Sequence, residues 1–198
     1  MGSLGRGSRA GMAGVVLAGS VMAVALAVAC GPPPSSATDA TAEAAPYPFT
    51  VLQIRAGCAP GRTIEYRVEK EGEPPRRERW SFAEADPETA RITTTTFDTE
   101  GKQVGPPVVE TARWTELHEH AHFPFAATTI NAEPITLPAG TFETMRYVVT
   151  KGDLVKTYWF ARSLPGPPVR LEVSKGGKPV MLMTMEANLS KPASVLPP

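Results

Sequence analysis

Three histidines lie close together near the middle of the chain, and theirs is the most conspicuous chemistry in the sequence. The segment Leu117–Phe123 contains His118, His120 and His122, which are all the histidines of the protein. On a strand the three would share a face, whereas on a helix His118 and His122 would align and His120 would point away. Either arrangement offers imidazole nitrogens to zinc or copper. The alternative is a solvated turn, because no zincin motif and no fixed general base accompany these histidines.

A methionine stripe is the second candidate. Met181, Met183 and Met185 occupy every other position of one segment, so on a strand they would share a face. Thioethers fill irregular gaps in cores, suit adaptable apolar sites and bind Cu(I). The methionine stripe can therefore belong to an ordinary core or line a flexible apolar groove. The rival interpretation is a copper site shared with the histidines.

No recognisable catalytic arrangement is present in the sequence. Carboxylates are scattered, and Ser81, Ser163 and Ser174 lack the glycines of a nucleophile elbow. Cys58 stands alone and is typical of a small buried apolar residue. Lys plus Arg equals Asp plus Glu at 20 each, so no net field favours nucleic acid. We predict a non-enzymatic protein that needs no cofactor and binds no nucleic acid.

The first 30 residues have the layout of an export signal. Arg6 and Arg9 precede the uncharged apolar run Met12–Ala29, which ends in small residues. The tetrad Ala27–Cys30 resembles the bacterial lipobox, with Ala at the position where Leu is most frequent. That resemblance implies removal of residues 1–29 and acylation of Cys30. A transmembrane helix or ordinary signal cleavage are the alternatives.

The rest of the chain divides into a tether, one domain and a tail. Residues 30–46 are rich in Pro, Ser, Ala and Thr and contain no large apolar residue, which predicts a disordered tether after the acylated cysteine. Residues 47–190 have the length of a single domain, expected to be monomeric. Residues 191–198 contain three prolines and predict a disordered tail. Loss of Arg6 and Arg9 with the signal leaves 18 basic against 20 acidic residues, so binding should depend on local surface.

The elements that must position these residues are mostly strands. The segment Thr63–Glu69 alternates strictly and places Ile64, Tyr66 and Val68 on one face. Similar strand signals recur in Arg79–Phe82, Arg91–Asp98, Phe142–Thr150, Leu154–Phe160, Val169–Val173 and the methionine segment. The gaps Lys151–Asp153 and Lys175–Lys178 have the composition of hairpin turns.

Only one short helix is predicted, from Thr115 to about Ala121, where Thr115 can cap and Pro124 ends the helical run. Because hairpin connections dominate and crossover helices are missing, the sheet should be antiparallel. The sequence therefore predicts a mainly β fold: one strongly curved antiparallel sheet of about nine to eleven strands, forming a half-barrel or open barrel.

Short motifs in the C-terminal half resemble a family of uncharacterised bacterial envelope proteins. They are Pro138–Phe142, Tyr158–Phe160 and Pro165–Arg170, and the resemblance covers about residues 130–190. The family is similar in fold to the half-barrel of the outer-membrane lipoprotein carrier and receptor proteins. The resemblance implies that fold and an apolar groove, and it supplies no catalytic residue.

We therefore expect a membrane-tethered domain that binds an apolar ligand, a lipid tail or another envelope protein through the concave face of its sheet. Gly31, in place of an Asp after the cysteine, resembles outer-membrane sorting if the source is Gram-negative. The main rival is a copper- or zinc-binding envelope protein that uses the histidines. The residues expected near the concave surface or the core beneath it are Trp80, Phe82, Trp114, Tyr147, Trp159, Met181, Met183 and Met185.

Overall fold

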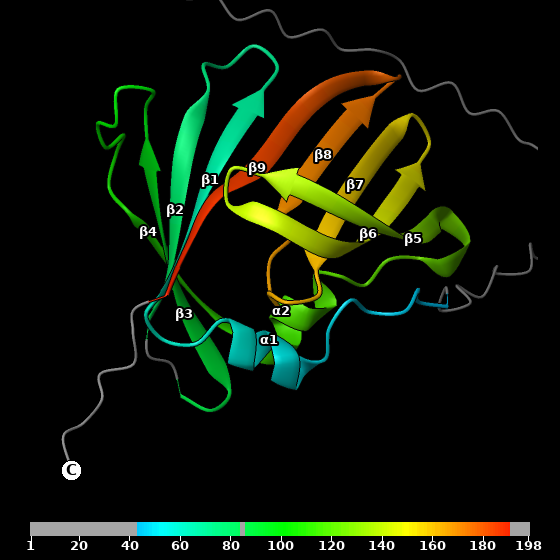
Figure 1. Cartoon of the computed structure of the whole chain (residues 1–198), viewed down its shortest axis with the longest axis horizontal. Coiled ribbons are helices and arrows are strands. Elements are labelled where there is room, and N and C mark those ends of the chain that lie inside the picture. The colour runs from blue at the N-terminus through cyan, green and yellow to red at the C-terminus, as the bar shows by residue number, and fades with distance from the viewer. Residues whose placement is uncertain (1–42, 84–85, 191–198) are drawn as a thin grey trace, which may run out of the picture. The chain divides into compact units, whose positions relative to one another are not determined.

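The computed structural model describes residues 43–83 and 86–190, which form a single antiparallel sheet with two short α-helices (Figure 1). The expected signal peptide, the acylation site Cys30 and the C-terminal tail lie outside these ranges. The sheet has nine strands and is not closed into a barrel, so the predicted fold class is confirmed. None of the helices in the described ranges has the length and apolar character needed to cross a bilayer.

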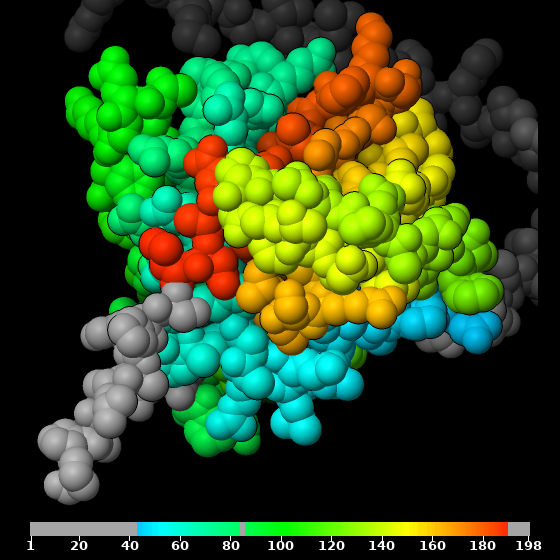
Figure 2. Space-filling view, in the orientation of Figure 1, coloured from blue at the N-terminus to red at the C-terminus, as the bar shows by residue number. Residues whose placement is uncertain are grey.

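The sheet is a sequence of hairpins joined at its centre by the first and last strands. Its order is β4-β3-β2-β1-β9-β8-β7-β6-β5, and all neighbouring strands are antiparallel. Figure 1 shows the sheet curving strongly, with the β5–β6 hairpin crossing in front of β7, β8 and β9, and in Figure 2 this hairpin covers part of β8 and β9. The strands are β1 (Arg62–Lys70), β2 (Arg76–Ala83), β3 (Thr89–Phe97), β4 (Val108–Arg113), β5 (Thr128–Leu137), β6 (Gly140–Lys151), β7 (Leu154–Ala161), β8 (Arg170–Lys175) and β9 (Lys178–Ser190).

The predicted alternation of β1 is confirmed by burial. Ile64 and Tyr66 are fully enclosed and Val68 nearly so, whereas the residues between them are partly or fully exposed. On the neighbouring strand β9, Met185 lies opposite Tyr66 and Met183 opposite Val68. Residues directly opposite in an antiparallel pair point to the same face. The methionine stripe therefore shares the buried face of β1.

The two predicted hairpin turns are present. Gly152 joins β6 to β7 with a φ of 61°, and Gly176 and Gly177 join β8 to β9 with φ values of 57° and 76°. Two successive residues with positive φ are the requirement of a type I′ turn, which matches the twist of the flanking strands. Glycine meets that requirement without steric cost.

The helices differ from the prediction. The predicted helix is α2 (Trp114–Glu119), and a second helix, α1 (Val51–Gly57), was not expected. The prediction of one helix was wrong because a seven-residue helix is too short to show a hydrophobic period. Its local signal is the capping box, in which the Thr50 side chain accepts from the Gln53 backbone and the Gln53 side chain accepts from the Thr50 backbone.

Two edge strands, β4 and β5, also had no corresponding prediction. Pro134 interrupts the pattern of β5, and proline is tolerated there because β5 lies at an edge of the sheet. The short β4 is exposed along most of its length, so it lacks the alternation of buried and exposed residues that marks a strand.

The ordered domain includes residues that the sequence placed in the tether. Ala44 forms a β-bridge with Pro124, and the Ala45 amide donates to the Phe123 carbonyl at 2.8 Å. Ala45 is only 2% exposed. Residues 43–46 therefore belong to the packed structure and not to the predicted tether.

Candidate functional site: an apolar cavity between the sheet and the helices

An apolar cavity of about 190 Å³ lies between one face of the sheet and the helical side of the domain. Strands β2, β3 and β7 form one wall, and α1, α2, the N-terminal segment and the turn before β8 form the other. The lining residues are Pro48, Phe49, Ile54, Cys58, Trp80, Phe82, Ile92, Leu117, His118, His120, Ala121, Phe123, Tyr158, Phe160, Gly166, Pro167 and Pro168.

The sheet wall is aromatic. Trp80 lies opposite Ile64 in the β1–β2 register, and its indole packs edge-on against Tyr66 with 5.1 Å between ring centroids. On β7, Tyr158 and Phe160 point to the same face, with centroids 6.0 Å apart. Aromatic rings provide a large apolar contact area in fixed orientations. This wall is therefore suited to an apolar occupant.

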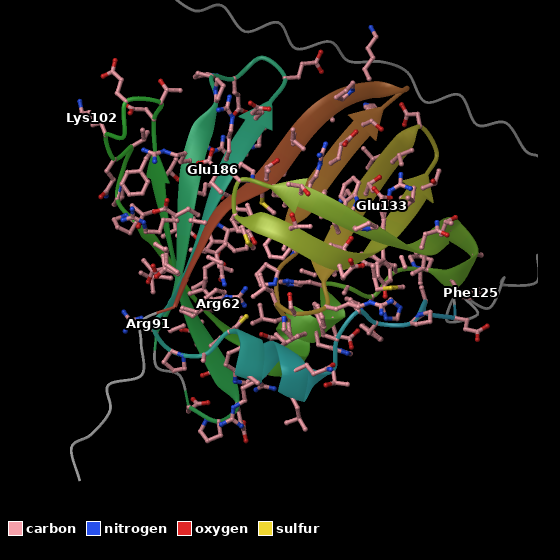
Figure 3. All side chains as sticks on the ribbon, in the orientation of Figure 1. Arg62, Arg91, Lys102, Phe125, Glu133 and Glu186 are labelled. Atoms are coloured by element: carbon pink, nitrogen blue, oxygen red, sulfur yellow. The ribbon has the colours of Figure 1, made fainter. Side chains whose placement is uncertain are left out.

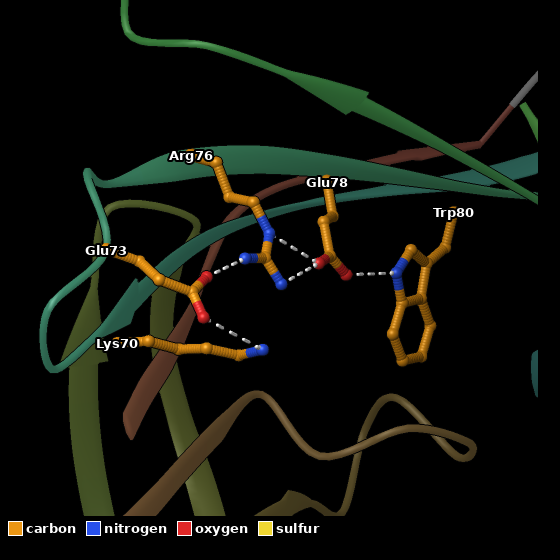
Figure 4. Close-up of polar contacts among 5 residues, drawn as sticks. All are labelled: Lys70, Glu73, Arg76, Glu78 and Trp80. Carbon is orange, nitrogen blue, oxygen red and sulfur yellow. Dashed lines mark hydrogen bonds and ion pairs between the residues drawn. The ribbon is translucent and has the colours of Figure 1, made fainter. Parts of the chain in front are cut away.

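A chain of polar contacts fixes the Trp80 ring (Figure 4). The Trp80 indole donates to Glu78 at 3.1 Å, and the same carboxylate accepts from Arg76 at 3.1 Å. Arg76 also contacts Glu73 at 2.8 Å, and Glu73 lies 3.9 Å from the Lys70 ammonium. The contacts satisfy the indole N–H and hold the apolar part of the ring in place.

The opposite wall depends on a close approach of α1 to the turn before β8. Gly57 at the end of α1 has no side chain, and a Cβ there would lie 2.1 Å from the Pro165 carbonyl oxygen. The absence of a side chain lets the helix contact the turn directly. Ile54 and Cys58 then face the cavity from α1, and Gly166 faces it from the turn.

The histidines lie at the end of α2, and two of them reach the cavity. His118 and His120 line it, whereas His122 does not. Tyr47 stacks on His118 at 3.9 Å between centroids, and its hydroxyl lies 2.8 Å from His122 Nδ1 and donates to Glu119 at 3.0 Å. This hydrogen bond is the main cause of a lowered pKa at the Glu119 carboxyl. Within residues 43–83 and 86–190, no group of three or more His, Cys, Asp or Glu side chains has metal-binding geometry.

Cys58 is a buried thiol in the cavity wall. Its side chain has no disulfide partner and is almost completely enclosed. Burial raises the pKa of the Cys58 thiol from 9.0 to about 11, although the nearby Arg62 guanidinium opposes this shift. Since the thiolate is the reactive form, a thiol protonated at neutral pH is a poor nucleophile. Cys58 therefore contributes a weakly polar surface to the cavity.

The other expected residues divide between the core and the opposite face. Trp80 and Phe82 line the cavity, while Trp114, Tyr147, Met183 and Met185 are buried in the core beside it, and Met181 packs against that core. Trp159 points away from Tyr158 and Phe160 and lies between two guanidinium groups. Arg146 is 5.6 Å and Arg170 is 5.1 Å from its ring centroid.

Sequence reasoning missed much of the helical wall. Pro48 and Phe49 line the cavity from a segment without a recognisable motif, and Gly166–Pro168 line it from an irregular turn. The only available signals were the Thr50–Gln53 capping box and the Gly-Pro-Pro run, which indicate a helix start and a turn but not what they enclose. No protein-family model matches the chain, and no curated protein matches it.

Proposed function

We propose that the protein is a membrane-anchored bacterial lipoprotein whose β domain binds an apolar ligand without catalysing a reaction. The observation that carries this proposal is the cavity of about 190 Å³ between the aromatic sheet wall and the helices. Apolar cavities bind small apolar molecules readily, and an engineered cavity of about 150 Å³ accommodates benzene. Small-molecule sites are typically concave and mostly apolar with a few polar groups, and this cavity has that character.

The volume limits the ligand to a small ring or part of an acyl chain. Scaled from the engineered cavity of about 150 Å³ that accommodates the six carbons of benzene, the cavity of about 190 Å³ holds about seven carbon atoms. Burying each methylene contributes about 0.8 kcal/mol, or about 6 kcal/mol in total before the costs of binding. A lipid with one medium-length chain, or the end of a longer one, fits this limit.

Two features support a binding role over catalysis. The polar side chains that line the cavity are those of Cys58, His118 and His120, with the hydroxyl-bearing ring of Tyr158. The raised pKa of Cys58 keeps its thiol protonated at neutral pH. A nucleophile is activated by an adjacent base, by a lowered pKa or by a metal ion. The described contacts include no hydrogen bond between Cys58 and a histidine.

Ligand binding in the cavity can be tested by native mass spectrometry, which detects a bound apolar molecule, and by a substitution that fills the cavity. Ala121 lines the cavity, whereas Ala126 is exposed and does not. Ala121→Phe should lower the affinity for 1-octanol by at least tenfold, because the new ring occupies the ligand's space. The matched variant Ala126→Phe should leave the affinity unchanged. If both variants fold and bind 1-octanol with equal affinity, the cavity is not the binding site.

The membrane anchor rests on the lipobox-like tetrad Ala27–Cys30 and is tested separately. Stable anchoring needs two or more acyl chains, because a single chain binds only marginally. Cys30→Ala should move the protein to the soluble fraction and leave its thermal unfolding unchanged. Retention of this variant on membranes after a high-salt wash would require another anchor. The residue after the cysteine, Gly31, favours outer-membrane sorting in a Gram-negative cell.

A further inference from the structure

A buried arginine beside the cavity has no acidic partner within residues 43–83 and 86–190. Arg62, the first residue of β1, is 5% exposed (labelled in Figure 3). Its Nε donates to Asn188 at 2.9 Å, and its Nη1 donates to the carbonyl oxygens of Gly57 at 2.6 Å and Pro165 at 2.9 Å. These bonds use three of the five N–H groups of a guanidinium. Nη2 has no hydrogen-bond partner, and the ion pairs found among the described residues do not include Arg62.

The guanidinium lies next to two residues of the cavity wall. Cys58 and Gly166 both line the cavity, and Cys58 Sγ is 3.9 Å from Arg62 Nη1. A Cβ on Gly166 would lie 2.7 Å from Cys58 Sγ and 3.3 Å from Nη1. The missing side chain at Gly166 therefore lets the turn pack closely against Cys58 and Arg62.

We propose that the ligand is a medium-chain amphiphile with a single carboxylate, whose chain fills the apolar cavity and whose head group pairs with Arg62. This inference rests on the proposed function and names the ligand class for the same cavity. A guanidinium forms strong charge-assisted hydrogen bonds with carboxylates, and Nη2 of Arg62 has no hydrogen-bond partner among the described residues. The head group approaches the guanidinium from the part of the cavity lined by Cys58 and Gly166.

The charge balance selects a monoanion. A buried charge is stable only when it is paired and hydrogen-bonded, and among the described residues Arg62 has hydrogen bonds but no counter-charge. One carboxylate neutralises this charge and accepts a hydrogen bond from Nη2. A dianionic phosphate would leave an excess negative charge in an apolar enclosure. A neutral alcohol would accept a hydrogen bond but leave the cation unpaired.

The test compares probes with the same chain and different head groups on the full chain carrying Cys30→Ala, so that no attached acyl group competes. Binding of octanoate, 1-octanol and octylamine at pH 7.5 is followed by calorimetry and by tryptophan fluorescence, to which Trp80 in the cavity wall contributes. We expect octanoate to bind at least tenfold more tightly than 1-octanol, and octylamine to bind most weakly. Equal or tighter binding of 1-octanol would overturn the carboxylate assignment while leaving the apolar cavity in place. Failure of all three probes to bind would overturn the proposed function as well.

Two variants assign the selectivity to Arg62. Arg62→Gln removes the charge but can still donate to a carbonyl, and it should bring the affinities for octanoate and 1-octanol within threefold of each other. Arg62→Lys keeps the charge and should retain part of the preference for octanoate. Undiminished selectivity in a folded Arg62→Gln protein would overturn the proposal. If Arg62→Gln does not fold, the comparison of head groups on the protein with Arg62 intact still decides it.

Discussion

Tyr66 shows how a single polar atom is accommodated in the core. Its side chain is 0% exposed, and its hydroxyl donates to the Pro168 carbonyl at 3.0 Å. Burial is the main cause of a raised pKa at this hydroxyl, so the ring stays neutral. A buried donor and acceptor that satisfy each other avoid the cost of an unpaired polar group. The bond also connects β1 to the turn that lines the cavity.

Substitutions of Tyr66 should distinguish the contribution of its ring to stability from that of its hydroxyl. Tyr66→Phe leaves the Pro168 carbonyl without this donor and should cost about 1 kcal/mol. Tyr66→Asp places a charge in the same enclosure and should prevent folding. The neighbouring Glu65 pairs with Arg79 on the other face, and Glu65→Lys should cost less than about 1 kcal/mol. Urea unfolding measures the stability of Tyr66→Phe and Glu65→Lys, and Tyr66→Asp should show no cooperative transition. A Tyr66→Asp protein as stable as Glu65→Lys would contradict the burial of this face.

The raised pKa of the Cys58 thiol predicts how its reactivity changes with pH. Burial raises the pKa of its thiol from 9.0 to about 11. At pH 8 the native thiolate fraction is then about one in a thousand, compared with about one in ten in the unfolded chain. Alkylation of the Cys30→Ala chain by iodoacetamide, followed by mass spectrometry, should be at least a hundredfold slower in the native state. The native rate should rise about tenfold per pH unit toward pH 11, and a plateau between pH 8 and 9 would contradict the raised pKa.

The same pKa shift affects stability. The folded state holds its proton more tightly than the unfolded state, so the stability from the protonated thiol is fully present below pH 9. It is lost as the pH rises from 9 to about 11. Cys58→Ala should remove this contribution to the alkaline loss of stability, and the raised pKa of Tyr66 should leave a remainder.

At the scale of elements, the central strands and α2 were predictable, whereas α1 and the turn before β8 were not. The alternation of Ile64, Tyr66 and Val68 reflects a strand with one buried face, and the glycine-containing turns specify hairpins by their backbone conformation alone. These are local signals. The turn at Gly166 is held to α1 through Arg62, which donates both to the nearby Gly57 carbonyl and to the Pro165 carbonyl 103 residues away. A local pattern cannot report which distant segments a buried guanidinium joins.

The same limit applies to the candidate site. Trp80 and Phe82 could be predicted as residues of a buried strand face, and both line the cavity. Sequence could not separate them from Trp159, because alternation identifies the two faces of a strand but not what covers each face. Trp159 lies on the other face, where Arg146 and Arg170 cover its ring.

The contact between α1 and the turn can be tested at Gly57. A Cβ at this position would lie 2.1 Å from the Pro165 oxygen, a backbone atom that cannot move without shifting the turn. Gly57→Ala should therefore cost about 2–3 kcal/mol or more, although alanine favours helices. The adjacent exposed position provides the control, because Ala56→Ser should change stability by less than about 1 kcal/mol. Stabilisation by Gly57→Ala in thermal unfolding would show that the helix and turn are not in contact.

At the scale of the whole molecule, the N-terminal segment contributes to both proposed functions, membrane anchoring and ligand binding. Residues 43–50 lead from the expected tether into the domain, and within them Pro48 and Phe49 line the cavity. Phe49 packs edge-on against Phe160 at 6.0 Å, and the Tyr147 hydroxyl donates to the Pro46 carbonyl at 3.0 Å. The segment that would carry the membrane anchor is therefore also part of the cavity wall. The domain boundary predicted from composition, before residue 47, divides this segment.

This connection predicts a difference between two fragments that start four residues apart. The fragment 43–190 keeps the bridge of Ala44 with Pro124 and the bond from Ala45 to the Phe123 carbonyl. The fragment 47–190 begins at the boundary that composition suggests and loses both, together with the acceptor of the Tyr147 hydroxyl. It should be less stable by about 2–4 kcal/mol, because buried polar groups lose their partners and a buried alanine is removed. Urea unfolding of the two fragments and of 39–190 measures the difference. We expect 39–190 and 43–190 to agree, and equal stability of all three would mean that residues 43–46 contribute nothing to the fold.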